Sequence, residues 1–301
     1  MITIDINQDD CVQNEDTGAY ECDVRMRFTP EDIAVPPPEP PVEPPVEPPV
    51  EPPVTGDVLH VDFSDVDKGP LSDSDIKEIF GSGGVLRRSE IAVVDDPANS
   101  GRGNVMSVFY PKGKAGKESG GQWQVSIPGR DKYYFSQDIY VPEGFNWMIS
   151  NKLSGLYGGR LGSVDGEYGV EGFAFRQSVQ SERRPGDTAG YYGIGDGALG
   201  GFLGSYKPQR KRVWYEGRMI AGKWVRLEQK LDIDAGTCEV WVNGKPAYKR
   251  SGIQYSKGNN LKIEGVSFIF WYGGGSPGWD AREDQRFYYD NFIVSTQPIS
   301  H

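Results

Sequence analysis

The stretch from Lys223 to Gly244, KWVRLEQKLDIDAGTCEVWVNG, decides the fold class. Apolar and polar residues alternate along Lys223–Ile233 and again along Cys238–Val242, which is the period-two pattern of a half-buried β-strand. The dipeptide Asn243–Gly244 follows, and both of its residues tolerate the positive φ that a two-residue hairpin turn requires. The stretch therefore predicts strands joined by tight turns.

The same pattern recurs through residues 57–301. Further strands are expected at Val58–Phe63, Val105–Tyr110, Trp123–Ile127, Tyr133–Val141, Glu171–Ser178, Ile263–Tyr272 and Phe287–Val294. One helix is expected at Ser74–Phe80, where Ser72 or Ser74 can cap the free N–H groups. Many short strands with one short helix predict an all-β fold, a jelly-roll β-sandwich of two antiparallel sheets.

A proline-rich tract separates this domain from the N-terminus. The tetrapeptide EPPV occurs four times between residues 39 and 54, and 11 of the 22 prolines lie between Pro36 and Pro53. Proline fixes φ and the glutamates repel one another, so residues 35–56 are expected to form an extended polyproline II linker. A stiff linker indicates that its two ends act in different places.

Residues 1–34 are too few to build a core of their own without a disulfide or a partner. We interpret them as an anchor that binds a protein partner. Cys11 and Cys22 can bridge this segment, and the sequence leaves open whether they do. Cys238 lies in a strand-like run and is expected to be a packed free thiol.

The net charge of −11 belongs to the N-terminal part of the chain. Residues 1–56 hold 13 acidic residues and two arginines, whereas residues 57–301 hold 30 acidic and 30 basic residues. Within residues 101–250 there are 22 basic against 15 acidic residues. A basic surface attracts polyanions, either nucleic acid or a polysaccharide of uronic acids or sulfates, and the alternative is a solvated surface with no partner.

Two motifs with known chemistry fail on their context. Gly195–Gly200 matches G-x-G-x-x-G, but no strand–helix–strand pattern surrounds it, and a mobile glycine-rich loop is the better interpretation. Asp62, Asp65 and Asp67 are spaced loosely like a calcium loop but lack its distal glutamate. With only His60 and His301 in the chain, we expect no metal and no cofactor.

Basic stretches interleaved with aromatic residues predict a sugar-binding surface. Arg184 and Lys207 lie in two such stretches, near tyrosines and tryptophans on which sugar rings can stack. The same mixture suits single-stranded nucleic acid. No nucleic-acid motif is present, and the acidic net charge argues against that partner. No apolar run is long enough for membrane insertion.

Two regions resemble a known family. Residues 152–159, KLSGLYGG, are similar to the K-L-P-G-L-Y-G-G signature of the family 14 polysaccharide lyases and the related glucuronan lyases, and residues 140–147, YVPEGFNW, to the lead-in before it. Residues 271–279, WYGGGSPGW, and residues 289–292, YDNF, resemble the family's C-terminal pair of motifs. The proline-rich linker also resembles that of algal-virus members.

The resemblance implies a β-jelly roll that cleaves a uronic-acid polysaccharide, of alginate or glucuronan type, by β-elimination. That reaction needs a donor that neutralises the uronate carboxylate, a base for the C5 proton and an acid for the leaving O4. Lysine, arginine and tyrosine can supply all three functions, which fits a chain with two histidines.

Carried over by position, the resemblance implies specific roles. Lys152 is the candidate base or carboxylate clamp, and Arg176 is the candidate carboxylate binder. Tyr191 and Tyr192 stand near the family's Y-x-Y and are candidates for the acid or base. Tyr157, Arg184, Lys207 and Trp279 are candidate substrate-binding residues.

The sequence departs from the family on the active strand. Ala174 replaces its serine, Val179–Gln180 replaces W-R, and Tyr191–Tyr192 breaks Y-x-Y. These departures leave two hypotheses open beside that of a lyase with altered specificity. One is a non-catalytic glycan-binding jelly roll on a stiff stalk, such as a virion or cell-surface attachment protein. The other is a capsid-like structural protein. Because a wall polysaccharide lies outside the cell, we expect an extracellular or virion-associated protein, although no signal peptide is visible.

Overall fold

The computed structural model divides the chain into two units, Met1–Glu51 and Pro52–His301, which are described separately. In the first unit it describes the backbone of two strands. In the second it describes residues 56–87, 89–147, 151–160, 171–180, 193–194, 197–207, 211–258, 260–274 and 278–299. The EPPV repeats lie outside these residues, and their polyproline II conformation stays a prediction.

The N-terminal unit contains an antiparallel pair of strands, β1 (Thr3–Gln13) and β2 (Tyr20–Arg27). Their backbone register places Cys11 directly opposite Cys22. Directly opposed strand positions lie at Cα separations of about 4.5–5.5 Å, which is within the range that a disulfide spans. The Cys11–Cys22 disulfide nevertheless stays a prediction.

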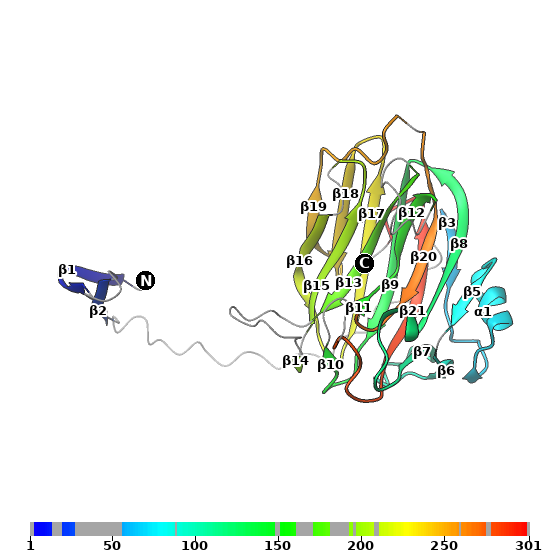
Figure 1. Cartoon of the computed structure of the whole chain (residues 1–301), viewed down its shortest axis with the longest axis horizontal. Coiled ribbons are helices and arrows are strands. Elements are labelled where there is room, and N and C mark those ends of the chain that lie inside the picture. Colours follow the sequence, from blue (N-terminus) through cyan, green and yellow to red (C-terminus); the bar gives the residue numbers. More distant parts are fainter. Residues whose placement is uncertain are drawn as a thin grey trace, which may run out of the picture. The chain divides into compact units, whose positions relative to one another are not determined.

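The larger unit is a β-sandwich of two antiparallel sheets (Figure 1). The nine-stranded sheet runs in the order β19 (Lys245–Arg250), β18 (Thr237–Val242), β17 (Trp224–Asp232), β9 (Lys132–Tyr140), β21 (Gln285–Ser295), β7 (Asn104–Tyr110), β6 (Ile91–Asp95), β4 (Gly69–Pro70), with β3 (Asp57–Val61) also paired to β21. Its strands include most of those that the sequence predicts.

The eight-stranded sheet forms the other layer. Its order is β16 (Lys211–Met219), β15 (Gly197–Gly204), β13 (Gly172–Gln180), β12 (Gly155–Gly159), β20 (Ile263–Phe270), β8 (Gly121–Arg130), β5 (Val85–Arg87), and β11 (Asn151–Lys152) also pairs with β13. A two-stranded pair, β10 (Asn146–Trp147) with β14 (Gly193–Ile194), and a 3₁₀ turn at Gly116–Glu118 complete the strands and turns described. The predicted jelly-roll sandwich is confirmed.

Aromatic side chains fill the space between the sheets. The ring of Phe268, fully buried on β20, lies 4.8 Å from Phe80 and 5.2 Å from Phe292 on β21 (centroid distances). Phe80 ends the one α-helix of the described residues, α1 (Asp73–Phe80), which lies beside β5 (Figure 1). Ser72 caps it in a capping box with Asp75, as the sequence predicted for Ser72. The sandwich therefore has one continuous aromatic core.

Local predictions on the second half of the chain have mixed outcomes. The hairpin turn between β18 and β19 is confirmed, with φ of 49° at Asn243 and 72° at Gly244. Cys238 is a buried free thiol, and burial raises its pKa to about 12. The glycine-rich loop expected at Gly195–Gly200 is wrong from Gly197 onward, because these residues begin β15 inside the eight-stranded sheet.

The outer face of the nine-stranded sheet, the side turned away from the core, holds a buried network of charges. Both oxygens of Asp138 accept hydrogen bonds, Oδ1 from Arg226 Nε at 2.8 Å and Oδ2 from Arg102 Nη1 at 2.6 Å. Burial alone would raise the pKa of Asp138, but the two guanidinium groups hold it below its usual value. Asp290 lies beside them, with an oxygen 3.6 Å from Arg102, and burial raises its pKa to about 7.

The raised pKa of Asp290 predicts a pH-dependent stability. Between about pH 4 and pH 7 the folded protein keeps a proton on Asp290 that the unfolded chain releases, so the unfolding free energy falls as the pH rises. We expect Asp290→Asn to remove this fall, a difference on the order of 2 kcal/mol between the two pH values. Urea unfolding of both proteins at pH 4.5 and 7.5 measures it, and parallel pH dependences would contradict it.

Candidate active site

The two outer faces of the sandwich carry different charged groups. The outer face of the nine-stranded sheet carries ion pairs, such as Asp138 with Arg226 and Glu239 with Lys230. The outer face of the eight-stranded sheet carries Lys152, Arg176 and Arg212. Cationic side chains attract an anionic polymer. The candidate site therefore lies on the eight-stranded sheet.

Lys152 is fixed to this sheet from two sides. Its strand β11 pairs with β13, which places Lys152 opposite Ser178, and its N–H donates to the carbonyl oxygen of Trp271 at 2.8 Å. Its ammonium Nζ lies 4.7 Å from the centroid of the Trp271 ring, a cation–π contact. The neighbouring Asn151 accepts a hydrogen bond from the N–H of Gly273 at 2.9 Å, which ties the same segment to the loop after Trp271.

The charge of Lys152 is disfavoured by its surroundings. Lys152 is half-buried, and burial lowers the pKa of its ammonium because water no longer solvates the charge. The positive charge of Arg176 lowers this pKa further. A lysine with a lowered pKa is neutral in a larger fraction of molecules and can accept a proton.

Arg176 lies on the same face of β13 as Ser178, one same-face step of about 7 Å along the strand. Phe175 on the other side of the strand is fully buried in the core, so alternation turns Arg176 outward. It pairs in register with Phe202 on β15. The two cationic side chains thus come from neighbouring rows of one sheet face.

Close packing between strands explains the glycines of the signature KLSGLYGG. Strand β12 lies between β13 and β20, and a Cβ atom on Gly155 would collide with the carbonyl oxygen of Phe175. A Cβ atom on Gly158 would collide with the Phe173 ring and with the carbonyl oxygen of Lys262. The close approach of the three strands at these points therefore requires glycine.

Tyr157 is the aromatic residue of β12 on the outer face. It pairs with Ala174 on one side and with Gly265 on the other, and its ring lies over Gly265, where a Cβ atom would collide with it. Burial raises the pKa of its hydroxyl, although a hydrogen bond with Ser126 acts in the opposite direction. Tyr157 therefore keeps its proton at neutral pH.

The structure brings together only part of the predicted site. Lys152, Arg176 and Tyr157 share one sheet face, and Trp279 is half-buried against Gly274 in the loop that contacts Asn151. Lys207 is exposed beyond the end of β15, in a bridge with Gln254, with its Nζ 5.5 Å from the Tyr206 ring. Arg184, Tyr191 and Tyr192 lie outside the described residues.

Sequence reasoning missed Trp271 as a partner of Lys152. The two residues are far apart in the chain, and the sequence predicts Trp271 only as part of the strand Ile263–Tyr272. The bridge between β11 and the end of β20 brings the indole under the ammonium. The motif WYGG was the available signal, because a tryptophan at the end of a strand before glycines can turn out of the core.

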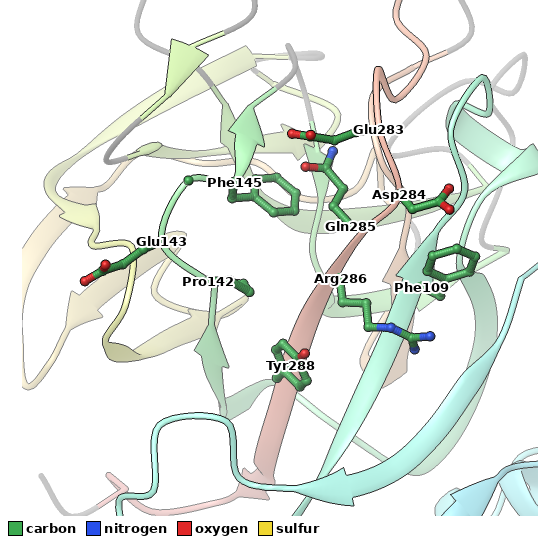
Figure 2. A pocket seen from close by; sticks show the side chains of 10 residues that line it. Phe109, Pro142, Glu143, Phe145, Glu283, Asp284, Gln285, Arg286 and Tyr288 are labelled. Atoms are coloured by element: carbon green, nitrogen blue, oxygen red, sulfur yellow. The ribbon is translucent and has the colours of Figure 1, made fainter.

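A cavity of about 450 Å³ lies elsewhere, beside the turn at residues 142–145 (Figure 2). It shares no residue with the cationic face, and Glu143, Glu283 and Asp284 contribute carboxylates to it. Its one cation, Arg286, lies along the Phe109 ring at 4.7 Å (Figure 2). Arg286 also pairs with Glu90 at 2.7 Å. This charge pattern does not suit an acidic polysaccharide.

The described residues contain no group of three or more His, Cys, Asp or Glu side chains that could hold a metal ion. Asp62, the first carboxylate of the loose calcium pattern, instead accepts a hydrogen bond from the N–H of Ser64 at 2.7 Å. Among the described helices, none is long and apolar enough to cross a membrane.

Residues 214–292 match the family model of polysaccharide lyase 14. The resemblance to family 14 polysaccharide lyases is thereby confirmed. The match covers the C-terminal strands, including both motifs at residues 271–279 and 289–292. No curated protein matches the chain.

Solved structures of lyases share the fold. The alginate lyase Aly36B is 16% identical, with a TM-score of 0.63 over 81% of this chain and 98% of its own. The alginate lyase vAL-1 from Chlorella virus is 16% identical, with a TM-score of 0.58 over 76% and 99%. The marine PL-14 alginate lyase from Aplysia kurodai is 17% identical, with a TM-score of 0.56 over 80% and 99%. The expected enzyme class, a polysaccharide lyase, is the class of the matched family and of these neighbours.

Gly155 is expected not to tolerate substitution, because no space is left for a Cβ atom there. In this sandwich, Gly155→Ala has to push β12 away from β13, and we expect a loss of more than about 3 kcal/mol of unfolding free energy. Gly129→Ala is the matched control, because its nearest neighbour would be an ordinary contact, the Cβ of Lys262 at 3.4 Å. Thermal unfolding compares the two variants, and equal melting temperatures would contradict the account.

Proposed function

We propose that this protein cleaves an anionic polyuronide, of the alginate or glucuronan type, by β-elimination. The observation that carries the proposal is the half-buried Lys152, whose lowered pKa has Arg176 on the same sheet face as one of its causes. The lowered pKa suits Lys152 to act as a base. Arg176, which stays charged, suits the role of the group that binds the substrate carboxylate.

The proposed reaction starts at the sugar whose carboxylate meets Arg176. The guanidinium pairs with this carboxylate and stabilises the negative charge that develops as the C5 proton leaves. Neutral Lys152 takes that proton, the electron pair forms the C4–C5 double bond, and the C4–O4 bond breaks. The departing O4 takes a proton from an acid, so that atoms and charges balance.

Tyr191 and Tyr192 remain our proposals for the acid, and Tyr157 for the lining of the site. Aly36B supports the combination of residue types, since a double variant with a lysine and a tyrosine each changed to alanine forms a complex with alginate tetrasaccharide. Tyr157 keeps its proton at neutral pH and presents a second hydroxyl on this face. Arg184, Lys207 and Trp279 are proposed to bind the polymer away from the scissile bond.

The N-terminal residues are proposed to place the enzyme. We propose that residues 1–34 bind a protein partner, that residues 35–56 space the lyase domain, residues 57–301, from it, and that the protein is extracellular or virion-associated. The similarity in fold to vAL-1 from Chlorella virus supports the last point.

A second candidate function is a glycan-binding module without catalysis. Ala174 favours it, because this nearly buried alanine pairs with Tyr157 where the resemblance implies a serine. Such a module binds acidic polysaccharide and releases no product.

Ultraviolet absorbance during incubation with alginate, glucuronan and a neutral glucan separates the two functions. We expect a rise with one polyuronide, because β-elimination leaves a C4–C5 double bond conjugated to the carboxylate. Lys152→Ala is expected to lower the rate by about 10²–10⁴-fold, whereas Lys249→Ala, on the opposite sheet, leaves it unchanged.

The pH dependence tests the role of Lys152 as base. The rate should rise with pH and level off below the ordinary pKa of lysine, since the neutral amine is the active form. A flat absorbance trace at neutral and alkaline pH, with binding retained, would favour the binding module. Full activity of Lys152→Ala would overturn the assignment of the base.

A further inference from the structure

Trp214 is exposed, whereas the other tryptophan, tyrosine and phenylalanine side chains whose burial the structure describes are buried or half-buried. It lies on β16, the edge strand of the eight-stranded sheet, and at 52% it is the most exposed large hydrophobic side chain of the described residues. Its neighbours Val213 and Tyr215 face the core, so Trp214 is on the outer face. An indole that is 52% exposed gains only part of the stability that burial provides, and its position needs another explanation.

The indole of Trp214 lies over Gly200. The two residues are paired in register, and a Cβ atom on Gly200 would be 3.2 Å from Cε3 and 3.6 Å from Cζ3 of the indole. Glycine at this position lets the ring rest on the backbone of β15. One side of the ring is thereby supported by the sheet while the residue remains half-exposed, which is the arrangement of a stacking platform.

The platform is in the same cross-strand row as Lys152. Lys152 pairs with Ser178, Ser178 with Gly200, and Gly200 with Trp214. This row covers three strand spacings, or about 14 Å, on one sheet face. A polymer that crosses the strands from Lys152 toward the sheet edge therefore reaches Trp214.

A second row runs parallel to the first. Arg176 pairs with Phe202, and Phe202 pairs with Arg212, which is exposed and precedes Trp214 by two residues on the same face. Each end of the path thus combines an aromatic ring with a cation, Trp271 with Lys152 and Trp214 with Arg212.

We propose that Trp214 and Arg212 form a distal subsite for a uronic-acid unit of the same polysaccharide that meets Lys152. The pyranose ring packs its C–H face on the indole, and its carboxylate pairs with the guanidinium. The subsite rests on the proposed function, because it takes its substrate class from that function. The subsite also requires a minimum chain length of the substrate. A trisaccharide cut at Lys152 leaves at most two sugar units on one side of the cut, too few to cover the span of about 14 Å to Trp214.

The test compares the Michaelis constants for polymer and trisaccharide in the full-length protein. We expect Trp214→Ala to raise the ratio of KM for the polyuronide to KM for the trisaccharide on the order of tenfold, with Trp214→Phe in between. Trp241→Ala is the matched control, a tryptophan on the nine-stranded sheet. It should leave both constants unchanged. An unchanged ratio in Trp214→Ala, with urea unfolding like the wild type, would overturn the subsite.

Affinity electrophoresis in gels that contain polyuronide separates this proposal from the catalytic one. If the wild type is retarded but cleaves nothing, loss of retardation in Trp214→Ala and not in Trp241→Ala still supports the subsite, and only the lyase proposal fails. If the two variants are retarded equally, or if the wild type is not retarded at all, the subsite is wrong.

Discussion

The ammonium of Lys152 contacts the face of the Trp271 ring and is repelled by the charge of Arg176. The candidate site depends on these two interactions. Two cations on one partly buried sheet face cost free energy, because each loses water and each repels the other. Backbone hydrogen bonds hold Lys152 in place despite this cost. The two-residue strand β11 is hydrogen-bonded to Trp271 on one side and to β13 on the other. An anionic substrate relieves the same repulsion when it binds, which links affinity to the strain of the free site.

The sandwich keeps the two kinds of charge on opposite sides. Its aromatic core holds the sheets together, so that each has one outer face. On the nine-stranded sheet Asp138 is saturated by Arg226 and Arg102. On the eight-stranded sheet, small residues at Gly155, Gly200 and Gly265 make room for strands and rings that approach closely. The face that we propose for the polyanion thus carries Lys152 and Arg176, and its glycines let the strands and rings approach closely.

Most of the fold could be predicted, because the alternation of apolar and polar residues indicates a half-buried strand, as along Trp224–Asp232. Strand β15 was not, because its glycines carry no alternation, and their role appears only beside partners such as Trp214 on Gly200. Lys152 and Arg176 entered through the family resemblance, which supplies roles that spacing alone does not. The contact of Lys152 with Trp271 joins residues distant in the chain, and no local pattern encodes it.

The account rests on a depressed pKa at Lys152, and a titration of the lysine side chains by nuclear magnetic resonance measures it directly. In protein labelled at the lysine ¹³Cε, one resonance should titrate below the ordinary lysine value of 10.5 and disappear in Lys152→Arg. The same resonance should move back toward that value in Arg176→Gln, because one of the two causes of the shift is removed. A Lys152 resonance that titrates with the exposed lysines, and does not respond to Arg176→Gln, would contradict the account.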